Sequence, residues 1–143
     1  MPRMTTPTDV TKHTGTCHCG AIRFEVEVDA SKGSRCNCRP CTKYGATTSI
    51  VKPAAFTLLS DESLLFSHGN EYGRRHFCRT CGVFCFAQGH LEMIGGDYVS
   101  VNLNCLDDID PADLKLAYWD GRHDNWEAGT RDTPWPVFTT TAA

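Results

Sequence analysis

Cysteines gather in three short clusters along this chain of 143 residues. Seven of the nine cysteines lie in Cys17-His18-Cys19, Cys36-Asn37-Cys38-Arg39-Pro40-Cys41 and Cys78-Arg79-Thr80-Cys81. Cysteines separated by one residue are poorly placed to bond each other, and an odd total argues against a disulfide framework. Thiolates on tight turns instead converge on one ion, as they do in Zn²⁺ sites. The spacing therefore favours metal binding over disulfides or inert buried thiols.

The clustered cysteines are enough for one closed tetrahedral site and one open site. The first and last clusters most simply supply the four ligands of the closed site, which are Cys17, Cys19, Cys78 and Cys81. The middle cluster supplies only three, Cys36, Cys38 and Cys41. Three protein ligands leave a fourth position for water or a substrate atom, which is typical of catalytic zinc. If His68, His76 or Cys85 completes this site, it becomes structural. Cys85 and Cys105 stand alone among apolar neighbours, so we predict that both are buried.

A zinc ion held by three thiolates favours thiol chemistry over hydrolysis. Its net charge of about −1 makes it a weaker Lewis acid than a three-histidine zinc site. A thiol that enters the open position would nevertheless be deprotonated at pH 7. The cations near the middle cluster could offset its charge and bind substrate carboxylates, or they could simply be solvated loop residues; they are Lys32, Arg35, Arg39 and Lys43.

Other polar and aromatic residues are weaker candidates for the site. His18 lies between two ligands, and we expect its side chain to point away from the metal. An adjacent carboxylate could orient His123 as a proton carrier, but an ordinary loop histidine is the simpler interpretation. Four aromatic residues could line a pocket, although core packing or a covered sheet edge is the preferred interpretation: Tyr118, Trp119, Trp126 and Trp135.

Short runs of β-branched and aromatic residues predict a mainly β fold. The clearest strand covers residues 21–28, where Ile22, Phe24, Val26 and Val28 alternate with charged side chains. Further strands are predicted at residues 47–51, 56–59, 64–68, 75–77, 83–87, 99–103 and 116–119. No stretch holds a helical stripe over three turns, and only residues 110–114 look like a helix start.

Length and composition predict one domain in a cytoplasmic protein. We expect a flexible tail at residues 1–14, one zinc domain at residues 15–138 and a C-terminal tail at residues 139–143. The net charge of −3 and the pI of about 6.0 provide no basic face for nucleic acid. No apolar run approaches the ~20 residues of a membrane span, and a reducing cytoplasm would preserve thiolate ligands. The sequence does not determine the oligomeric state, and a homo-oligomer is one of the states that it allows.

Three stretches together resemble one known family. They are Gly15-Thr16-Cys17-His18-Cys19-Gly20-Ala21-Ile22-Arg23-Phe24, Cys36-Asn37-Cys38-Arg39-Pro40-Cys41 and Arg75-His76-Phe77-Cys78-Arg79-Thr80-Cys81-Gly82. The chain resembles the glutathione-dependent formaldehyde-activating enzymes, which share their domain with the centromere protein V group, from residue 15 to about residue 138. The resemblance implies an Mss4-like fold of several small coiled antiparallel sheets stapled by zinc. The chain departs from many relatives at Arg39-Pro40, where they carry a small polar residue.

The same resemblance implies two zinc ions and a reaction. The structural zinc would lie on Cys17, Cys19, Cys78 and Cys81, and the catalytic zinc on Cys36, Cys38 and Cys41. The implied activity is of the carbon–sulfur lyase type, the reversible joining of formaldehyde to the thiol of glutathione as S-hydroxymethylglutathione. In this interpretation Arg35, Arg39 and Lys43 are candidates to bind the carboxylates of glutathione. The alternative is a non-catalytic, zinc-stabilised protein-binding module. A third possibility, chromatin association, is disfavoured by the negative net charge of the chain.

Overall fold

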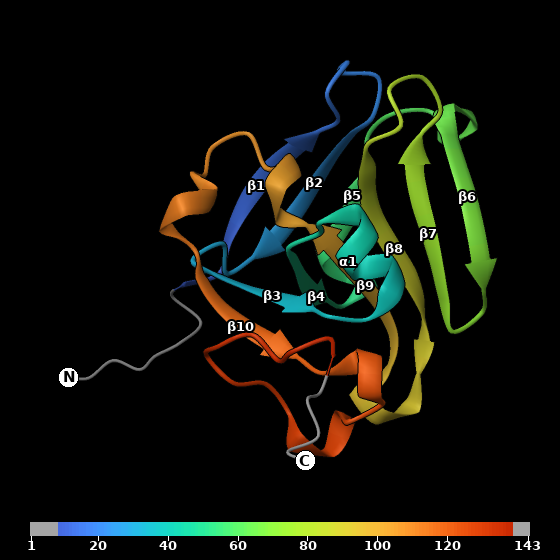
Figure 1. Cartoon of the computed structure of the whole chain (residues 1–143). Coiled ribbons are helices and arrows are strands. Elements are labelled where there is room, and N and C mark those ends of the chain that lie inside the picture. The colour runs from blue at the N-terminus through green and yellow to red at the C-terminus, as the bar shows by residue number, and fades with distance from the viewer. Residues whose placement is uncertain (1–8, 139–143) are drawn as a thin grey trace, which may run out of the picture.

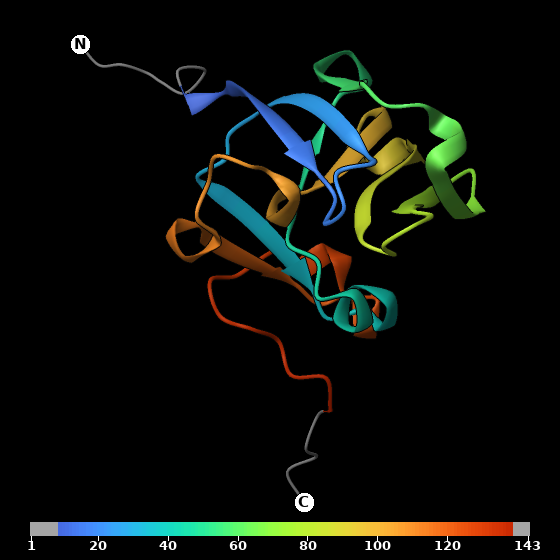
Figure 2. The same cartoon turned by 90° about the horizontal axis from the view of Figure 1, so that it is seen from above.

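The computed structural model describes residues 9–138, which form two β-sheets connected by loops and short helices (Figures 1 and 2). The smaller sheet is antiparallel, with the strand order β1-β2-β5. Its strands are β1 (Thr11–Thr16), β2 (Arg23–Val28) and β5 (Phe56–Leu58).

The larger sheet has seven strands in the order β10-β3-β4-β9-β8-β7-β6. In chain order they are β3 (Lys32–Cys36), β4 (Thr48–Val51), β6 (Leu65–Asn70), β7 (Gly73–Cys78), β8 (Phe84–Leu91), β9 (Gly96–Asn102) and β10 (Lys115–Trp119). Neighbouring strands are antiparallel except for β10, which runs parallel to β3 and pairs Trp119 with Cys36. The segment that follows β10 therefore starts beside the middle cysteine cluster.

The hydrophobic core draws on both sheets. β2 buries Phe24 and Val26 because its apolar residues alternate with charged ones. Phe86 and Val101 of the larger sheet are buried in the same cluster. Phe56 joins the two sheets, since its ring centroid lies 5.3 Å from that of Phe24 and 4.6 Å from that of Phe86. Cys85 and Cys105 are buried in this core, as the sequence predicts.

The single α-helix of the described chain, α1 (Arg39–Tyr44), begins inside the middle cysteine cluster. Pro40 lies in its first turn, where a backbone N–H has no partner within the helix, and Gly45 ends it in the left-handed conformation with a φ of 68°. The remaining helices between residues 9 and 138 are single 3₁₀ turns: η2 (Pro53–Ala55), η3 (Glu62–Leu64), η4 (Glu92–Ile94), η5 (Leu103–Cys105), η6 (Pro111–Asp113), η7 (Gly121–His123) and η8 (Trp126–Ala128).

The mainly β fold predicted from the sequence is confirmed, and each predicted strand overlaps a strand of the structure. Three elements differ from the prediction. β1 begins at Thr11, so the tail expected over residues 1–14 is too long; its residues are mostly polar and pair with β2 through the backbone. The other two elements, β3 and α1, are not predicted from the sequence. β3 has polar residues and Gly33 where an alternating apolar pattern would indicate a strand, and α1 is too short to show an apolar stripe. The expected helix start at residues 110–114 is the single turn η6.

The C-terminal tail expected at residues 139–143 lies outside the described residues. Among residues 9–138, no helix has the length and apolar character required to cross a membrane.

Candidate active site

The first and last cysteine clusters meet between the two sheets. Cys17 and Cys19 follow β1, whereas Cys78 ends β7 and Cys81 lies in the next turn. Their Sγ atoms lie within 4.8 Å of one another, with 3.7 Å between Cys17 and Cys19 and 3.6 Å between Cys19 and Cys78. A tetrahedron with Zn–S bonds of about 2.3 Å separates its sulfurs by about 3.8 Å. The four thiols therefore fit a zinc ion, and His18 between them is exposed and outside the group.

The middle cluster forms a second group of converging thiols at the end of β3 and the start of α1. The Sγ atoms of Cys36, Cys38 and Cys41 lie within 4.8 Å of one another. No other histidine, cysteine, aspartate or glutamate between residues 9 and 138 joins this group. The chain thus offers three sulfur ligands here, which fits a zinc ion with one open position.

The residues considered as a fourth ligand are engaged elsewhere. His68 Nε2 lies 3.4 Å from the hydroxyl of Tyr44, and His76 Nδ1 lies 2.6 Å from Ser67 Oγ. Cys85 has no exposed surface and lies in the hydrophobic core. None of the three completes the middle cluster.

The three close thiols cannot all ionise by themselves. Hydrogen bonds from the thiols of Cys38 and Cys41 lower the pKa of Cys36 to about 2, whereas hydrogen bonds with Cys36 and Cys38 raise the pKa of Cys41. Each ionised sulfur opposes ionisation of its neighbours, so one negative charge is shared by the cluster. A bound cation removes this opposition, which is why the group suits a divalent metal.

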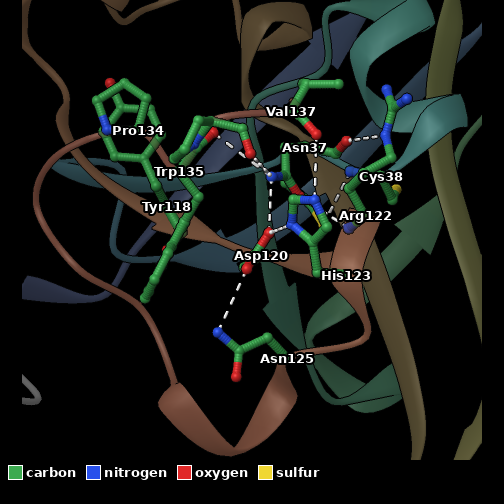
Figure 3. Close-up of polar contacts among 12 residues, drawn as sticks. Asn37, Cys38, Tyr118, Asp120, Arg122, His123, Asn125, Pro134, Trp135 and Val137 are labelled. Carbon is green, nitrogen blue, oxygen red and sulfur yellow. Dashed lines mark hydrogen bonds and ion pairs between the residues drawn. The ribbon is translucent and has the colours of Figure 1, made fainter. Parts of the chain in front are cut away.

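Asn37, between the first two cysteines of the middle cluster, is held by a network of hydrogen bonds (Figure 3). Its Nδ2 donates to Asp120 Oδ1 at 2.8 Å, and its Oδ1 accepts from the backbone N–H of Arg122 at 2.8 Å. The Nε of Arg122 also donates to the backbone oxygen of Asn37 at 2.9 Å. The segment after β10 therefore fixes the backbone from which Cys36 and Cys38 project.

Asp120 is the centre of this network, and it is buried. Burial raises its pKa, but hydrogen bonds from Asn37, His123 and Asn125 outweigh burial and leave the pKa below its ordinary value. His123 Nδ1 lies 2.7 Å from Asp120 Oδ1, and its Nε2 lies 3.1 Å from the backbone oxygen of Val137. Both ring nitrogens of His123 therefore have partners within the protein, and one of these partners is the Asp120 carboxylate.

A pocket of about 570 Å³ opens beside the middle cluster. It lies between α1 and one face of the larger sheet, and its lining includes Cys36, Cys38 and Cys41. Trp119 and Trp126 also line it, so for these two indoles the structure favours the pocket over the preferred interpretation of core packing or a covered sheet edge. Tyr118 and Trp135 lie outside the lining, where Trp135 Nε1 donates to the backbone oxygen of Tyr118 at 2.9 Å.

Gly121 allows this wall of the pocket to close against the cysteines. A Cβ at this position would lie 2.5 Å from Cys36 Sγ and 2.7 Å from the Trp126 ring. The absence of a side chain at Gly121 therefore lets an indole and a sulfur ligand share one side of the pocket.

The cations lie differently from the expectation. Arg35, Arg39 and Lys43 are exposed and do not belong to the pocket lining. Arg35 alternates with Cys36 along β3 and so faces the opposite side of the sheet. Within the part of the chain that the structure describes, the one cation in the lining is Arg75 of β7, whose guanidinium carbon lies 5.8 Å from the ring centroid of Tyr44. The sequence gives no local signal for Arg75, because β7 and α1 are brought together only by the fold.

Comparisons with known proteins agree with this geometry. A crystal structure of a Rhodobacter sphaeroides protein is similar, with a TM-score of 0.64 and 29% sequence identity, over 76% of this chain and 99% of that chain. A family model described as glutathione-dependent formaldehyde-activating enzyme matches residues 12–121, a stretch that contains every clustered cysteine and ends just after Asp120. A match over more than half of the sequence establishes that this chain belongs to the glutathione-dependent formaldehyde-activating enzyme family.

Proposed function

We propose that this chain is a zinc-dependent enzyme of the carbon–sulfur lyase type. It forms or breaks the adduct between the thiol of glutathione, or another thiol, and formaldehyde or a similar small carbonyl compound. The observation that carries this proposal is the group of three converging thiols on the wall of a pocket, with no fourth ligand among residues 9–138. Membership of the family supports glutathione and formaldehyde as the reactants.

The residues present fit the metal that this chemistry requires. Cys36, Cys38 and Cys41 would hold Zn²⁺, because an all-sulfur donor set of this geometry suits zinc. Zinc bound there supplies a position for the substrate sulfur and favours the thiolate over the thiol. The hydrogen bonds between Asn37 and Asp120 keep the ligands in place, and the apolar walls of the pocket limit the access of water.

The bond changes balance without an oxidant or reductant. In the direction of synthesis, a bond forms between the thiol sulfur and the carbonyl carbon, and the carbonyl oxygen takes up the proton that the thiol loses. The hydroxyls of Thr48 and Ser100 line the pocket and are suited to hydrogen bond with that oxygen. The reverse sequence releases the aldehyde and the thiol.

The charged ends of glutathione require separate partners. Arg75 lies in the pocket lining, so we propose that it binds one carboxylate. Arg39 and Lys43 are exposed on α1, from which their long side chains remain proposed partners for a carboxylate outside the pocket. Arg35 keeps only a general electrostatic role in this proposal, because it faces away from the pocket.

Exchange NMR spectroscopy at equilibrium tests the proposed reaction. Formaldehyde and glutathione combine spontaneously, so the measured quantity is the rate of exchange between free glutathione and S-hydroxymethylglutathione, not the yield. We expect the parent protein to accelerate exchange over protein-free buffer and Cys38→Ser to abolish the acceleration. Cys105→Ala is the matched control, because this buried cysteine lies outside both clusters and should preserve the acceleration.

The competing function is a zinc-stabilised module that binds another protein without catalysis. Identical exchange rates in buffer, with the parent protein and with Cys38→Ser would reject the enzyme proposal and favour the binding module. Zinc content should be measured in the same samples, so that loss of metal and loss of catalysis are separated.

A further inference from the structure

The pocket beside the middle cysteine cluster is much larger than formaldehyde requires. Its volume of about 570 Å³ falls among pockets that hold drug-sized ligands, whereas formaldehyde has only two non-hydrogen atoms. Apolar side chains form most of its wall, including Ala46, Ile50, Phe84, Leu91, Met93 and Trp126. Ile50, Met93 and Trp126 are exposed despite their apolar character. Exposed apolar side chains gathered around a cavity indicate a ligand with an apolar surface.

Glutathione itself does not match this wall. It carries two carboxylates and one ammonium group at neutral pH, and each of these needs a charged partner or water when it leaves the solvent. Among residues 9–138, Arg75 is the one basic side chain in the lining, and no aspartate or glutamate lines the pocket. At least one carboxylate and the ammonium group must therefore remain outside. The apolar part of the pocket is left for the other half of the adduct.

The apolar wall begins at the sulfur cluster. Trp119 pairs with Cys36 in the register of β10 and β3, and Trp126 lies beside the same sulfur across Gly121. From there the wall continues across the sheet, where Ile50 is opposite Ser100 and Ser100 is opposite Ala87. A group attached to the carbon that bonds to the substrate sulfur would meet the two indoles first and the sheet face next.

We infer that the carbonyl partner at this site is an aldehyde with an apolar body of several carbons, held as its adduct with glutathione. This inference rests on the proposed function. The sulfur of glutathione bonds to the aldehyde carbon, the carbonyl oxygen takes the thiol proton, and the alkyl or aryl group lies against Trp126 and Ile50. Formaldehyde would undergo the same reaction, but its adduct has no alkyl or aryl group to contact the apolar wall.

Stable thioether analogues test the apolar subsite without catalysis. Binding of S-methylglutathione and S-hexylglutathione is measured by titration calorimetry and by the fluorescence of the tryptophans in the wall. We expect S-hexylglutathione to bind at least about tenfold more tightly, because each buried methylene adds favourable transfer free energy. Ile50→Asn should reduce this ratio, and Leu59→Asn, an exposed apolar residue outside the lining, should leave it unchanged. Equal affinities for the two analogues, or equal effects of the two variants, would overturn the inference.

Exchange measurements separate this inference from the proposed function. With the parent protein, we expect the acceleration over buffer to be at least about tenfold greater for the hexanal adduct of glutathione than for the formaldehyde adduct. Acceleration for formaldehyde without a greater acceleration for hexanal would overturn the inference and support the proposed function. Acceleration for neither aldehyde would overturn the proposed function and the inference together.

Discussion

At the scale of single residues, Asp120 shows how a residue outside the cysteine clusters controls the site. Its carboxylate accepts hydrogen bonds from Asn37 and His123, and Asn37 lies between two of the proposed zinc ligands. Groups that hold a metal ligand in position contribute to metal affinity although they do not touch the metal. Asp120 is therefore a positioning residue for Cys36 and Cys38.

We predict that Asp120→Asn weakens zinc binding at the three-cysteine site by about tenfold. The amide has one acceptor oxygen in place of two, so its NH₂ group would face a hydrogen-bond donor of Asn37, His123 or Asn125. Competition with a chromophoric chelator measures the affinity, and Asp113→Asn is the control because it replaces an exposed carboxylate on η6. Unchanged zinc affinity in Asp120→Asn would show that the network does not position the ligands.

We predict that His76 makes the free energy of unfolding depend on pH. Burial lowers the pKa of this residue, whose Nε2 has no hydrogen-bond partner among the described residues. An unfolded histidine has a pKa of about 6.5, so between that value and the folded pKa the unfolded state binds more protons. The contribution of His76 to stability is complete above about pH 6.5 and is lost as the pH falls through the folded pKa.

The variant His76→Phe tests this dependence, because it removes the ionisable group and keeps an aromatic ring. An aromatic ring suits the position, since the ring of His76 already lies against Phe86 with 4.6 Å between centroids. Urea unfolding from about pH 7.5 to pH 5.5 should show a smaller loss of unfolding free energy in the variant than in the parent. Parallel stability curves over this range would contradict the assignment of this pH dependence to His76.

At the scale of elements, the four-cysteine group joins parts of the chain that belong to different sheets. The turn between β1 and β2 supplies Cys17 and Cys19, and the end of β7 with its following turn supplies Cys78 and Cys81. Cys19 and Cys78 are 59 residues apart in the sequence. A metal that closes such a contact contributes its binding free energy to folding. The three-cysteine group, in contrast, lies within one short segment from β3 to α1.

We therefore predict unequal effects of two matched substitutions. Cys78→Ser should lower the unfolding free energy by more than about 3 kcal/mol or prevent cooperative folding. Cys38→Ser should have a much smaller effect, because its site connects neighbouring residues. Thermal and urea unfolding of both variants provide the comparison. A soluble Cys78→Ser protein with the melting temperature of the parent would reject the structural role of the first site.

At the scale of the whole molecule, the two cysteine groups lie in different surroundings. One lies where the sheets meet, with Cys17 and Cys78 in the hydrophobic core, and the other lines a pocket. The second site has fewer protein ligands and direct access from the pocket. Loss of its metal should leave the fold intact.

Graded treatment with a chelator should release zinc in two steps. We expect the three-cysteine site to lose its metal first, without a change in far-ultraviolet circular dichroism, and the four-cysteine site to lose its metal with unfolding. Metal analysis after each step gives the stoichiometry, and Cys38→Ser should lack the first step. Simultaneous release of both ions from the parent would contradict this order.

The order of residue types along the chain was enough to predict where cysteine sulfurs gather and where one strand buries a face. Cysteines one to three residues apart can bring their sulfurs together on a compact turn, so their spacing predicted candidate metal sites. The alternation around Phe24 and Val26 likewise required a strand with one buried face. The count of clustered cysteines and the family resemblance together predicted how the clusters are grouped, and the structure places Cys17, Cys19, Cys78 and Cys81 within one group.

The surroundings of the three-cysteine group, in contrast, depend on how the chain folds. Asp120, Arg75 and Trp126 carry no local pattern that points to Cys36, because they reach it through strand pairing between distant segments. The parallel pairing of β10 with β3 depends on backbone hydrogen bonds, which any residue except proline can make. Likewise, α1 is too short for periodicity to predict it and is held by its caps and by packing. Residue types and spacing thus determine the ligands, whereas non-local backbone pairing determines the pocket in which they act.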